Sequence, residues 1–419
     1  MTPHQRLFAL EQFGIKLGLD NIRVILASLG HPECAYRSIH IAGTNGKGSV
    51  AAMVERGLRA AGWKTGRYTS PHLDRVEERV AIDGTPIDRP TFAQVTSDVF
   101  DAVDAARARG DLTVTPTFFE VSTAVAFEIF KRAGIDVAIV EVGLGGRYDA
   151  TNVLTPAITA ITSIAFDHER HLGSTLSAIA FEKAGIAKRG VPLVIGRLPP
   201  EAAQRVRGVA REVEAPVFEA PASPTDPTYP SLRGLTLALP GRHQLENATV
   251  AVAILERWSV MVRHVPAEAV VTGLTECEWP ARLEWLRVPP MNGELLIDAA
   301  HNPAGAAALA SYLQDMRSEA LPIVFAAMRD KDLRGMIAAL EPVAAAFVTT
   351  TVPHARARSA EQLAAEIRSM VRVPVEPAES ATAAVDRALE WSRRAVACGS
   401  IYMIGPLRAR LLEAGATRV

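Results

Sequence analysis

The sequence predicts an α/β protein of two domains, each with a mostly parallel sheet and helices packed on it. Its 419 residues exceed what a single hydrophobic core usually holds. Apolar β-like runs alternate with longer helical patterns over most of the chain, as they do where crossover helices connect parallel strands. A second series of short apolar runs begins after residue 293, so the same architecture is expected twice.

The first domain is expected to span residues 1–288. Strands with helices between them are predicted at 38–42, 137–142, 157–164 and 193–195. The Pro-rich stretch 220–230 is predicted to be a loop, because proline removes a backbone donor and fixes φ. We place the boundary later, near 285–293, where a loop with two prolines and a glycine precedes the second series of strands.

The second domain, residues 289–419, is predicted to be smaller and doubly wound. Its strands are expected at 295–298, 323–326, 346–350 and 401–404. Helical patterns lie between them, at 303–316 and 360–370 for example.

The composition is that of an ordinary globular protein, with 48% hydrophobic and 22% charged residues. Lys and Arg number 45 against 46 Asp and Glu, and the net charge is -1. This balance gives no general attraction to nucleic acid or to an anionic membrane. An anionic ligand must therefore be held by a local site.

The cysteines and the amino terminus indicate the compartment. Cys34, Cys277 and Cys398 are far apart and form no paired motif, which is typical of reduced intracellular thiols. Residues 1–10 carry no signal-peptide pattern, and no run of about 18 apolar residues could span a bilayer. We expect a cytoplasmic protein.

A glycine-rich segment at 43–49 follows a β-branched run and precedes a helical pattern, which is the context that a phosphate-binding loop requires. Its residues are Gly43, Thr44, Asn45, Gly46, Lys47, Gly48 and Ser49. Glycines let successive backbone N–H groups face an anion, Lys47 supplies a cation, and Ser49 supplies a hydroxyl for phosphate or Mg²⁺. The segment predicts binding of a nucleotide polyphosphate.

The match to the common phosphate-loop pattern is imperfect. Two residues separate Gly43 from Gly46, and Gly48 stands between Lys47 and Ser49. A glycine-rich turn without a ligand is the alternative.

Glu141 ends the apolar run 136–140 and stands before the glycine-rich loop 142–147. A carboxylate at the end of a neighbouring strand could bind Mg²⁺, which prefers hard oxygen ligands. The alternative is a glutamate in a structural salt bridge.

Ordered motifs along the chain resemble those of the folylpolyglutamate synthase and dihydrofolate synthase family, relatives of the Mur peptidoglycan ligases. They are the loop 43–49, Ser70-Pro71-His72-Leu73, the segment 141–152 (EVGLGGRYDATN), Asp167-His168, the segment 182–186 (EKAGI), His243-Gln244 with Asn247-Ala248, Trp279-Pro280-Ala281-Arg282, and the segment 298–303 (DAAHNP). The resemblance implies a phosphate-loop NTPase-like domain, a smaller Rossmann-like C-terminal domain and an active site in the cleft between them.

The resemblance also implies a metal site. Ser70, Glu141 and His168 would bind Mg²⁺, and Lys183 would be carbamylated, so that its cation becomes an anion. From the residues alone, Ser70 fits a turn or a helix cap, His168 a structural histidine, and Lys183 a helix-surface lysine.

The nucleotide would contact Asn247 and Arg282, with Asp298 and His301 reaching it from the second domain. Lys47, Lys183, Asp298 and His301 are the catalytic candidates. Without the resemblance, Arg282 and Asp298 fit an ion pair that links the domains.

For the pterin, the resemblance indicates three short segments. They comprise Leu17, Gly18 and Leu19, then Thr117, Phe118, Phe119 and Glu120, then Tyr148, Asp149 and Ala150. Adjacent aromatic residues could stack on a flat ring, although they are also common in cores. The segment that ends at Asp149 resembles that of bifunctional bacterial members, in which an aspartate at this position is associated with use of dihydropteroate. Tyr148 stands where Leu is more usual.

The resemblance therefore implies an ATP- and Mg²⁺-dependent ligase, expected to be a monomer, that joins L-glutamate to dihydropteroate and to reduced folates through an acyl phosphate. One alternative is a Mur-type ligase acting on a muramoyl substrate, whose loop usually has Thr or Ser directly after the Lys. Another is a catalytically silent nucleotide-binding relative. The position of Gly48 favours the folate branch and makes Ser70, in place of Ser49, the expected magnesium hydroxyl.

Overall fold

The computed structural model describes residues 1–14, 18–221, 234–290, 293–316 and 319–419. Contacts between residues divide the chain into two compact units. The first comprises Met1–Ile164, Leu172–Ala238 and Leu245–Cys277, and the second Ala165–His171, Leu239–Gln244 and Glu278–Val419. The assignment of ligand-binding roles to residues 1–288 and 289–419 stays a prediction.

The first unit contains an eight-stranded sheet within the described residues, ordered β4-β3-β2-β5-β1-β6-β7-β8. Strands β2, β5, β1, β6, β7 and β8 pair in parallel, while β3 and β4 add an antiparallel edge. The bounds are β1 Arg37–Ala42, β2 Thr65–Tyr68, β3 Val80–Ile82, β4 Thr85–Pro86, β5 Val137–Glu141, β6 Ile158–Ile161, β7 Leu193–Ile195 and β8 Val217–Glu219. The strands predicted in the first domain are confirmed as β1, β5, β6 and β7.

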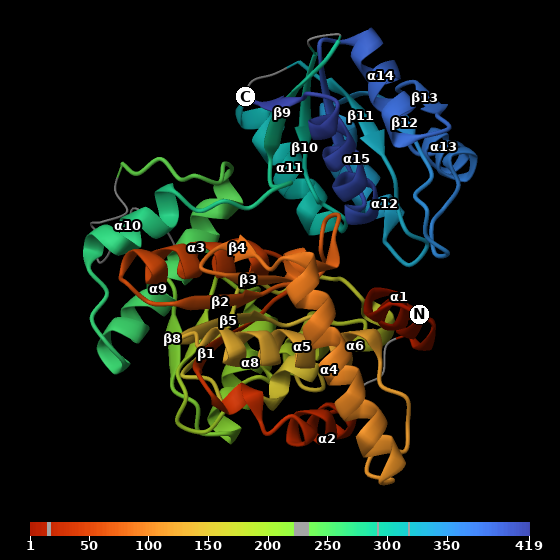
Figure 1. Ribbon diagram of the computed structural model, residues 1–419. Coiled ribbons are helices and arrows are strands. Elements are labelled where there is room, and N and C mark those ends of the chain that lie inside the picture. Colours follow the sequence, from red (N-terminus) through yellow and green to blue (C-terminus); the bar gives the residue numbers. More distant parts are fainter. Residues whose placement is uncertain (15–17, 222–233, 291–292, 317–318) are drawn as a thin grey trace. The chain divides into compact units, whose positions relative to one another are not determined.

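Helices cover this sheet (Figure 1). They are α1 Pro3–Phe8, α2 Asp20–Ser28, α3 Lys47–Ala60, α4 Arg89–Ala108, α5 Phe118–Ala133, α7 Leu176–Ala184, α8 Pro200–Glu212 and α10 Ala267–Thr275, while α6 Glu169–Leu172 and α9 Arg242–Met261 span the division between the units. Short 3-10 turns occur at Ala9–Phe13, Pro32–Cys34, Val76–Arg79 and Ala150–Val153 (η4). Of the predicted loop 220–230, residues 222–230 lie outside the described residues.

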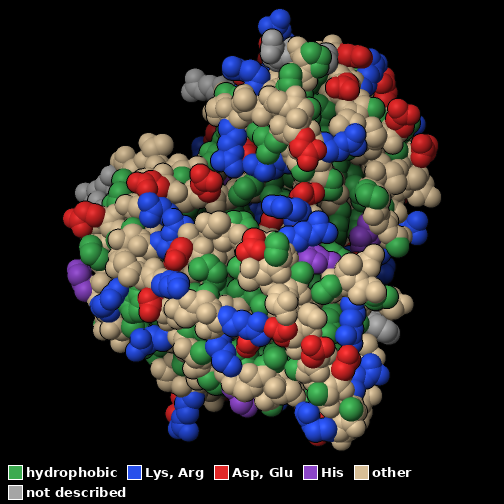
Figure 2. Space-filling view, in the orientation of Figure 1, with side chains coloured by type: hydrophobic (Ala, Val, Ile, Leu, Met, Phe, Trp, Pro, Cys, Tyr) green, Lys and Arg blue, Asp and Glu red, His purple; other side chains and the backbone are tan. Residues whose placement is uncertain are grey.

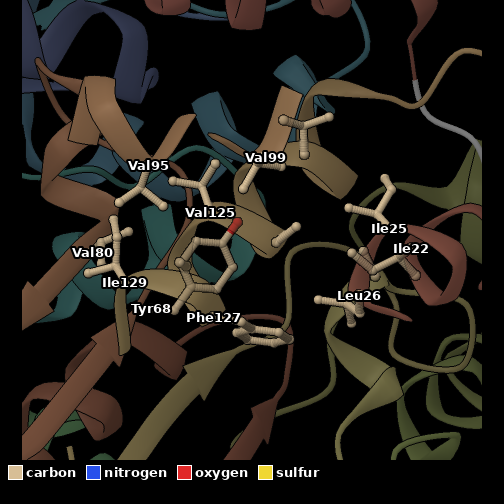
Figure 3. Packing of buried hydrophobic residues seen from close by; sticks show 14 of the residues in the cluster. Ile22, Ile25, Leu26, Tyr68, Val80, Val95, Val99, Val125, Phe127 and Ile129 are labelled. Carbon is tan, nitrogen blue, oxygen red and sulfur yellow. The ribbon is translucent and has the colours of Figure 1, made fainter. Parts of the chain in front are cut away.

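One face of the first sheet is packed against α2, α4 and α5. Val95 and Val99 of α4, Val125 of α5 and Tyr68 of β2 meet there (Figure 3). These side chains are at most 2% exposed, so their burial supplies a large share of the hydrophobic stabilisation of this layer.

The second unit contains a seven-stranded sheet within the described residues, ordered β13-β12-β11-β14-β10-β9-β15. The strands from β13 to β10 are parallel, and β9 and β15 are antiparallel to their neighbours. The bounds are β9 Glu284–Val288, β10 Gly293–Ile297, β11 Leu321–Phe325, β12 Ala344–Thr349, β13 Val375–Pro377, β14 Arg394–Cys398 and β15 Thr417–Arg418. The helices are α11 Pro303–Asp315, α12 Leu333–Leu340, α13 Ala360–Arg368, α14 Ala381–Trp391 and α15 Ile401–Glu413, with a 3-10 turn at Glu341–Val343.

The predicted strand at 401–404 is wrong, because these residues begin α15. Their apolar side chains belong to a helical face on which Met403, Ile404, Leu407 and Leu411 are buried. The strand that pairs with β10 and β11 is instead β14. Most of its side chains are small, so its sequence does not resemble that of a typical strand. The predicted strands at 295–298, 323–326 and 346–350 are confirmed as β10, β11 and β12, with small shifts at their ends.

Acidic and basic side chains are interspersed over the visible face of each unit (Figure 2). Among the helices described, none has the length and apolar character needed to cross a membrane.

Candidate active site

The turn after β1 has the backbone form that glycine allows. Gly43 has φ 149° and Gly46 has φ 85°, both in the region that favours glycine. A Cβ at Gly43 would lie 2.0 Å from Thr162 Oγ1, and one at Gly46 would lie 2.2 Å from Asn247 Oδ1. Both glycines are therefore required by conformation and by close packing.

The residues after β6 hold this loop. The Thr44 N–H donates to the Ser163 carbonyl at 2.8 Å, and the Asn45 N–H donates to Ser163 Oγ at 3.0 Å. The hydroxyls of Thr162 and Ser163 donate to the Asn45 carbonyl at 2.6 and 2.9 Å. The loop is thus fixed by a parallel neighbour strand before any ligand binds.

Helix α3 begins at Lys47, directly after the loop. Its N-cap, Gly46, has no side chain with which to cap the helix. The first N–H groups of a helix have no intrahelical acceptor, and they carry the positive end of the helix dipole. Such an N-terminus favours an anion such as phosphate.

Lys47 and Glu141 form a nearly buried pair at the ends of two adjacent elements. Lys47 Nζ donates to the Thr44 carbonyl at 3.2 Å and lies 3.7 Å from Glu141 Oε1. The Lys47 and Glu141 side chains are only 15% and 7% exposed. Glu141 therefore forms a salt bridge through Oε1. Its other carboxylate oxygen, Oε2, has a different partner.

That partner is Ser70, whose backbone N–H donates to Glu141 Oε2 at 3.3 Å. Two of the three predicted magnesium ligands thus adjoin one another, beside Lys47. The third, His168, belongs to the second unit. Within the described ranges, no three His, Cys, Asp or Glu side chains cluster as a metal centre. Mg²⁺ commonly uses one or two protein carboxylates together with phosphate oxygens and water, so a single buried glutamate fits it.

Lys183 is buried, at 5% exposure, so its interpretation as a surface lysine is wrong. It lies at the end of α7, and its Nζ donates to the Gly43 carbonyl at 2.9 Å. The Lys183 amine therefore contacts the backbone of the phosphate loop.

In the second unit, Asp298 follows β10 and has a structural task. Its Oδ2 accepts from the Leu283 N–H at 2.9 Å, and its Oδ1 accepts from the Ala300 N–H at 2.8 Å. Arg282 and Asp298 both belong to the second unit, so their interpretation as a domain-linking ion pair stays a prediction. Burial, followed by the charge of Arg282, lowers the pKa of the neighbouring His243, although Asp298 acts in the opposite direction.

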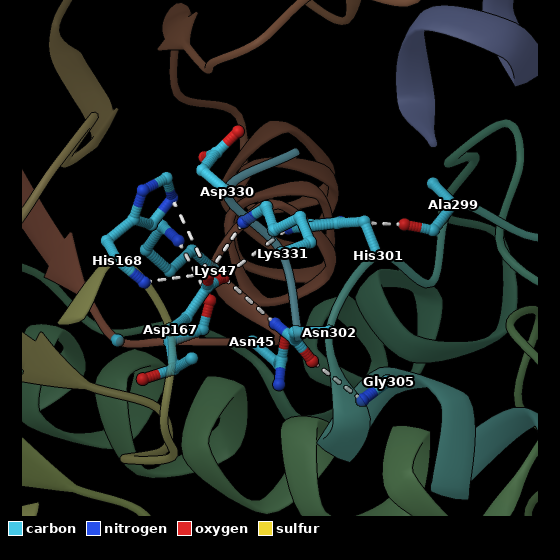
Figure 4. A network of polar contacts seen from close by, with 12 residues as sticks. Asn45, Lys47, Asp167, His168, Ala299, His301, Asn302, Gly305, Asp330 and Lys331 are labelled. Carbon is cyan, nitrogen blue, oxygen red and sulfur yellow. Dashed lines mark hydrogen bonds and ion pairs between the residues drawn. The ribbon is translucent and has the colours of Figure 1, made fainter. Parts of the chain in front are cut away.

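Asp167 is the centre of a polar network in the second unit (Figure 4). Its carboxylate accepts from Lys331 Nζ at 2.6 Å and from Asn302 Nδ2 at 3.1 Å, and it lies 3.6 Å from His301 Nε2. The His168 N–H also donates to it, at 2.9 Å. Burial alone would raise the pKa of Asp167, but the adjacent His301 ring and the Lys331 charge hold that pKa well below its usual range.

The ring of His301 lies between two acceptors. Its Nδ1 is 2.8 Å from the Ala299 carbonyl, which can only accept, so Nδ1 carries a hydrogen. Its Nε2 faces the Asp167 carboxylate. A ring held in this way, with both nitrogens facing acceptors, is well placed to orient a ligand.

The comparisons with known proteins agree with this geometry. A family model described as "Mur ligase, glutamate ligase domain" matches residues 281–398. The dihydrofolate synthase/folylpolyglutamate synthase of Bacillus subtilis (strain 168) is 34% identical, over 96% of each chain. The chain belongs to the dihydrofolate synthase/folylpolyglutamate synthase family.

Solved structures extend the match to three dimensions. Mycobacterium tuberculosis folylpolyglutamate synthase complexed with ADP and AMPPCP has a TM-score of 0.87 at 33% identity, covering 97% of this chain and 98% of that chain. A bifunctional folylpolyglutamate synthase/dihydrofolate synthase with Mn, AMPPNP and L-glutamate bound has a TM-score of 0.84 at 30% identity, covering 98% of each.

The residues that the family resemblance indicates for the pterin have varied surroundings. Thr117 and Glu120 form the capping box of α5, and Phe118 is 8% exposed, with its ring 5.6 Å from that of Phe8. Tyr148 is 39% exposed and lies beneath the Arg147 guanidinium.

The remaining pterin candidates differ in burial, and one of them lies outside the described residues. Phe119 packs with Tyr68 at a centroid distance of 6.1 Å, while Asp149 and Ala150 are buried. Gly18 and Leu19 precede α2, and Leu17 lies outside the described residues.

Several supporting residues of this family member escaped the sequence analysis. Lys331 lies in a charged turn after β11 and is part of no motif. Asp167 is part of the Asp167-His168 motif, but the sequence assigns it no role of its own. Thr162 and Ser163 are small polar residues after an apolar run, which is a weak signal of a loop support. All of these residues follow parallel strands, and this shared position in the sequence could have indicated them.

Proposed function

We propose that this chain is an ATP-dependent amide ligase that joins L-glutamate to dihydropteroate and adds further glutamates to reduced folates. The observation that carries this proposal is the Lys47 and Glu141 pair, 3.7 Å apart beside a preformed phosphate loop. The full-length similarity to dihydrofolate synthase/folylpolyglutamate synthases supplies the acceptor and the amino acid.

The first chemical step activates a carboxylate. A carboxylate oxygen is a poor leaving group, so the γ-phosphoryl group of ATP is transferred to it and an acyl phosphate forms, with ADP as the other product. Lys47 Nζ and the N–H groups at the start of α3 would disperse the charge of the transferring group, which is the main catalytic resource in phosphoryl transfer. Mg²⁺ would supply further charge neutralisation when bound.

The second step forms the amide. The amine of glutamate attacks the acyl carbon, the bond to phosphate breaks, and the departing phosphate takes up the proton that the nitrogen loses. We assign Asp298 and His301 to organising this step, with His301 orienting a ligand. Water must be excluded while the acyl phosphate exists, because hydrolysis would waste it.

Ser70, Glu141 and His168 are the proposed holders of Mg²⁺. The contact between the Ser70 N–H and Glu141 Oε2 supports the first two. We also propose that Lys183 is carbamylated, and its burial next to the Gly43 carbonyl supports a role within the site.

The nucleotide is assigned to the loop 43–49 with Asn247, Arg282, Asp298 and His301. Residues 1–288 would bind ATP and the pterin, and residues 289–419 would complete binding of glutamate and ATP. The pterin is assigned to residues 17–19, 117–120 and 148–150. We further propose a cytoplasmic monomer that binds no nucleic acid and no membrane.

Mass spectrometry of the products tests the proposal. The protein is incubated with ATP, Mg²⁺ and glutamate, together with dihydropteroate, tetrahydrofolate or a muramoyl substrate. We expect mass increases of one glutamate on dihydropteroate and of one or more on tetrahydrofolate. Product from the muramoyl substrate alone would establish the Mur-type alternative, and nucleotide binding without any product would establish a silent relative.

A further inference from the structure

A buried hydrogen-bonded chain links β1 to the loop that follows β5. His40, in the middle of β1, and Thr151, in η4, are both completely buried. His40 Nε2 lies 2.8 Å from Thr151 Oγ1, and the Thr151 hydroxyl donates to Asp149 Oδ1. Polar side chains from two distant parts of the chain are therefore connected inside the first unit.

The direction of the protons follows from the end of the chain. Asp149 Oδ1 accepts from both the Thr151 N–H and the Thr151 hydroxyl, so the Thr151 oxygen must in turn accept from a His40 Nε2–H. His40 Nδ1 is a buried atom without a hydrogen-bond partner. Leaving an unprotonated Nδ1 without a partner costs less free energy than leaving a buried N–H without one. The tautomer with its hydrogen on Nε2 is therefore favoured.

Asp149 in turn closes the loop 142–149. Its Oδ2 accepts from the Leu144 N–H at 2.8 Å, and its Oδ1 accepts from the Thr151 N–H at 3.0 Å. The carboxylate thus joins the beginning of the loop to its end. At 5% exposure it is part of the interior.

The loop is clamped on its other sides as well. A Cβ at Gly143 would lie 2.4 Å from the Phe119 ring, and one at Gly146 would lie 2.8 Å from the Lys183 carbonyl. The Arg147 N–H donates to the Glu182 carbonyl at 2.8 Å. The loop therefore connects Glu141, which stands directly before it, to the end of α7 that carries Lys183.

We propose that His40 and Thr151 are positioning residues that fix the loop 142–149 for the folate acceptor, without touching any substrate. This inference rests on the proposed function. The nucleotide side should be less sensitive to them, because the phosphate loop is held separately by Thr162 and Ser163.

The test compares steady-state kinetics of the full-length enzyme and of His40→Leu, His40→Gln and Thr151→Val. Leu fills a similar volume and cannot donate, whereas the Gln amide nitrogen can replace Nε2–H. The matched control is Thr65→Val, because Thr65 is also a fully buried strand threonine whose hydroxyl donates to a buried carboxylate, that of Glu55 at 2.8 Å.

We expect the KM for dihydropteroate to rise about 3- to 10-fold in His40→Leu and Thr151→Val, the effect of losing roughly one hydrogen bond. The KM for ATP should stay within about twofold of wild type, and His40→Gln should restore most of the acceptor affinity. Thr65→Val should lower the melting temperature without changing either constant.

Unchanged acceptor KM in a folded His40→Leu protein would overturn the inference while leaving the proposed function intact. An equal rise in the KM for ATP would also overturn it, since it would show a general structural role. If Thr151→Val does not fold, His40→Leu decides alone. A wild-type protein that makes no folate product would instead overturn the proposed function, which this experiment detects before any variant is measured.

Discussion

Lys47 is the residue on which phosphoryl transfer should depend most. Its Nζ is held between the Thr44 carbonyl and Glu141, in a site where little water screens its charge. We expect Lys47→Ala to lower kcat/KM by at least about a hundredfold, the usual effect of removing a group that stabilises transition-state charge. Lys131→Ala, at a 39% exposed lysine of the same unit, is the control and should retain activity.

His40 also predicts a pH dependence of stability. Burial, followed by the charge of Lys188, lowers its pKa to about 3. Between that value and the unfolded pKa of about 6.5, the unfolded chain binds a proton that the folded protein does not, so stability rises with pH. At pH 5 the folded state should lose about 2 kcal/mol relative to pH 7.

Denaturant unfolding at the two pH values measures this loss. His40→Leu should remove it, whereas His264→Gln, at an exposed histidine, should not. An identical pH dependence in wild type and His40→Leu would show that His40 is not the group responsible.

At the scale of the element, the turn before α3 makes a prediction about two glycines with nearly the same backbone. Gly46 has φ 85° and Gly62 has φ 79°, but only at Gly46 does an added Cβ meet a side chain, that of Asn247. Alanine at either position should cost about 1–2 kcal/mol from its left-handed conformation. Only Gly46→Ala should raise the Kd for an ATP analogue, by calorimetry; equal affinities would mean that Asn247 can move aside freely.

The cap of α11 gives a second test at this scale. Asn302 Oδ1 accepts from the Gly305 N–H at 2.8 Å while its Nδ2 donates to Asp167. Ser380, which caps α14, accepts from the Ala383 N–H at 3.1 Å, and its hydroxyl also forms a local bond with the Thr382 hydroxyl. Loss of a cap costs about 1 kcal/mol, so Ser380→Ala should lose that amount and Asn302→Ala clearly more, by denaturant unfolding. Equal losses would show that the bond to Asp167 adds no stability.

At the scale of the whole molecule, nucleotide binding should raise the free energy of unfolding. A ligand that binds only the folded state at 100 times its Kd adds about 2.7 kcal/mol. We expect an ATP analogue with Mg²⁺ to raise the melting temperature of the wild type, and to have little effect on Lys47→Ala. A similar rise in both proteins would show that the main nucleotide site lies elsewhere.

Much of the whole fold could be predicted because parallel strands such as β1 and β5 are buried on both sides and read as continuous apolar runs. The phosphate loop was predictable for the same reason, since Gly43 and Lys47 follow such a run at short range. The 401–404 error arose because an apolar run of four residues has no period that separates strand from helix. Lys331 could not be predicted, because its partner Asp167 is 164 residues away in the chain.

The division of the chain has a consequence for the order in which the protein can fold as it is synthesised. Asp167 leaves the ribosome long before Asn302 and Lys331, which lie 135 and 164 residues later. Amino-terminal regions generally fold first during synthesis, yet Ala165–His171 belongs with residues not yet made. The nascent chain must therefore keep this short segment solvated, with the Asp167 carboxylate lacking its lysine partner, until Lys331 has been made.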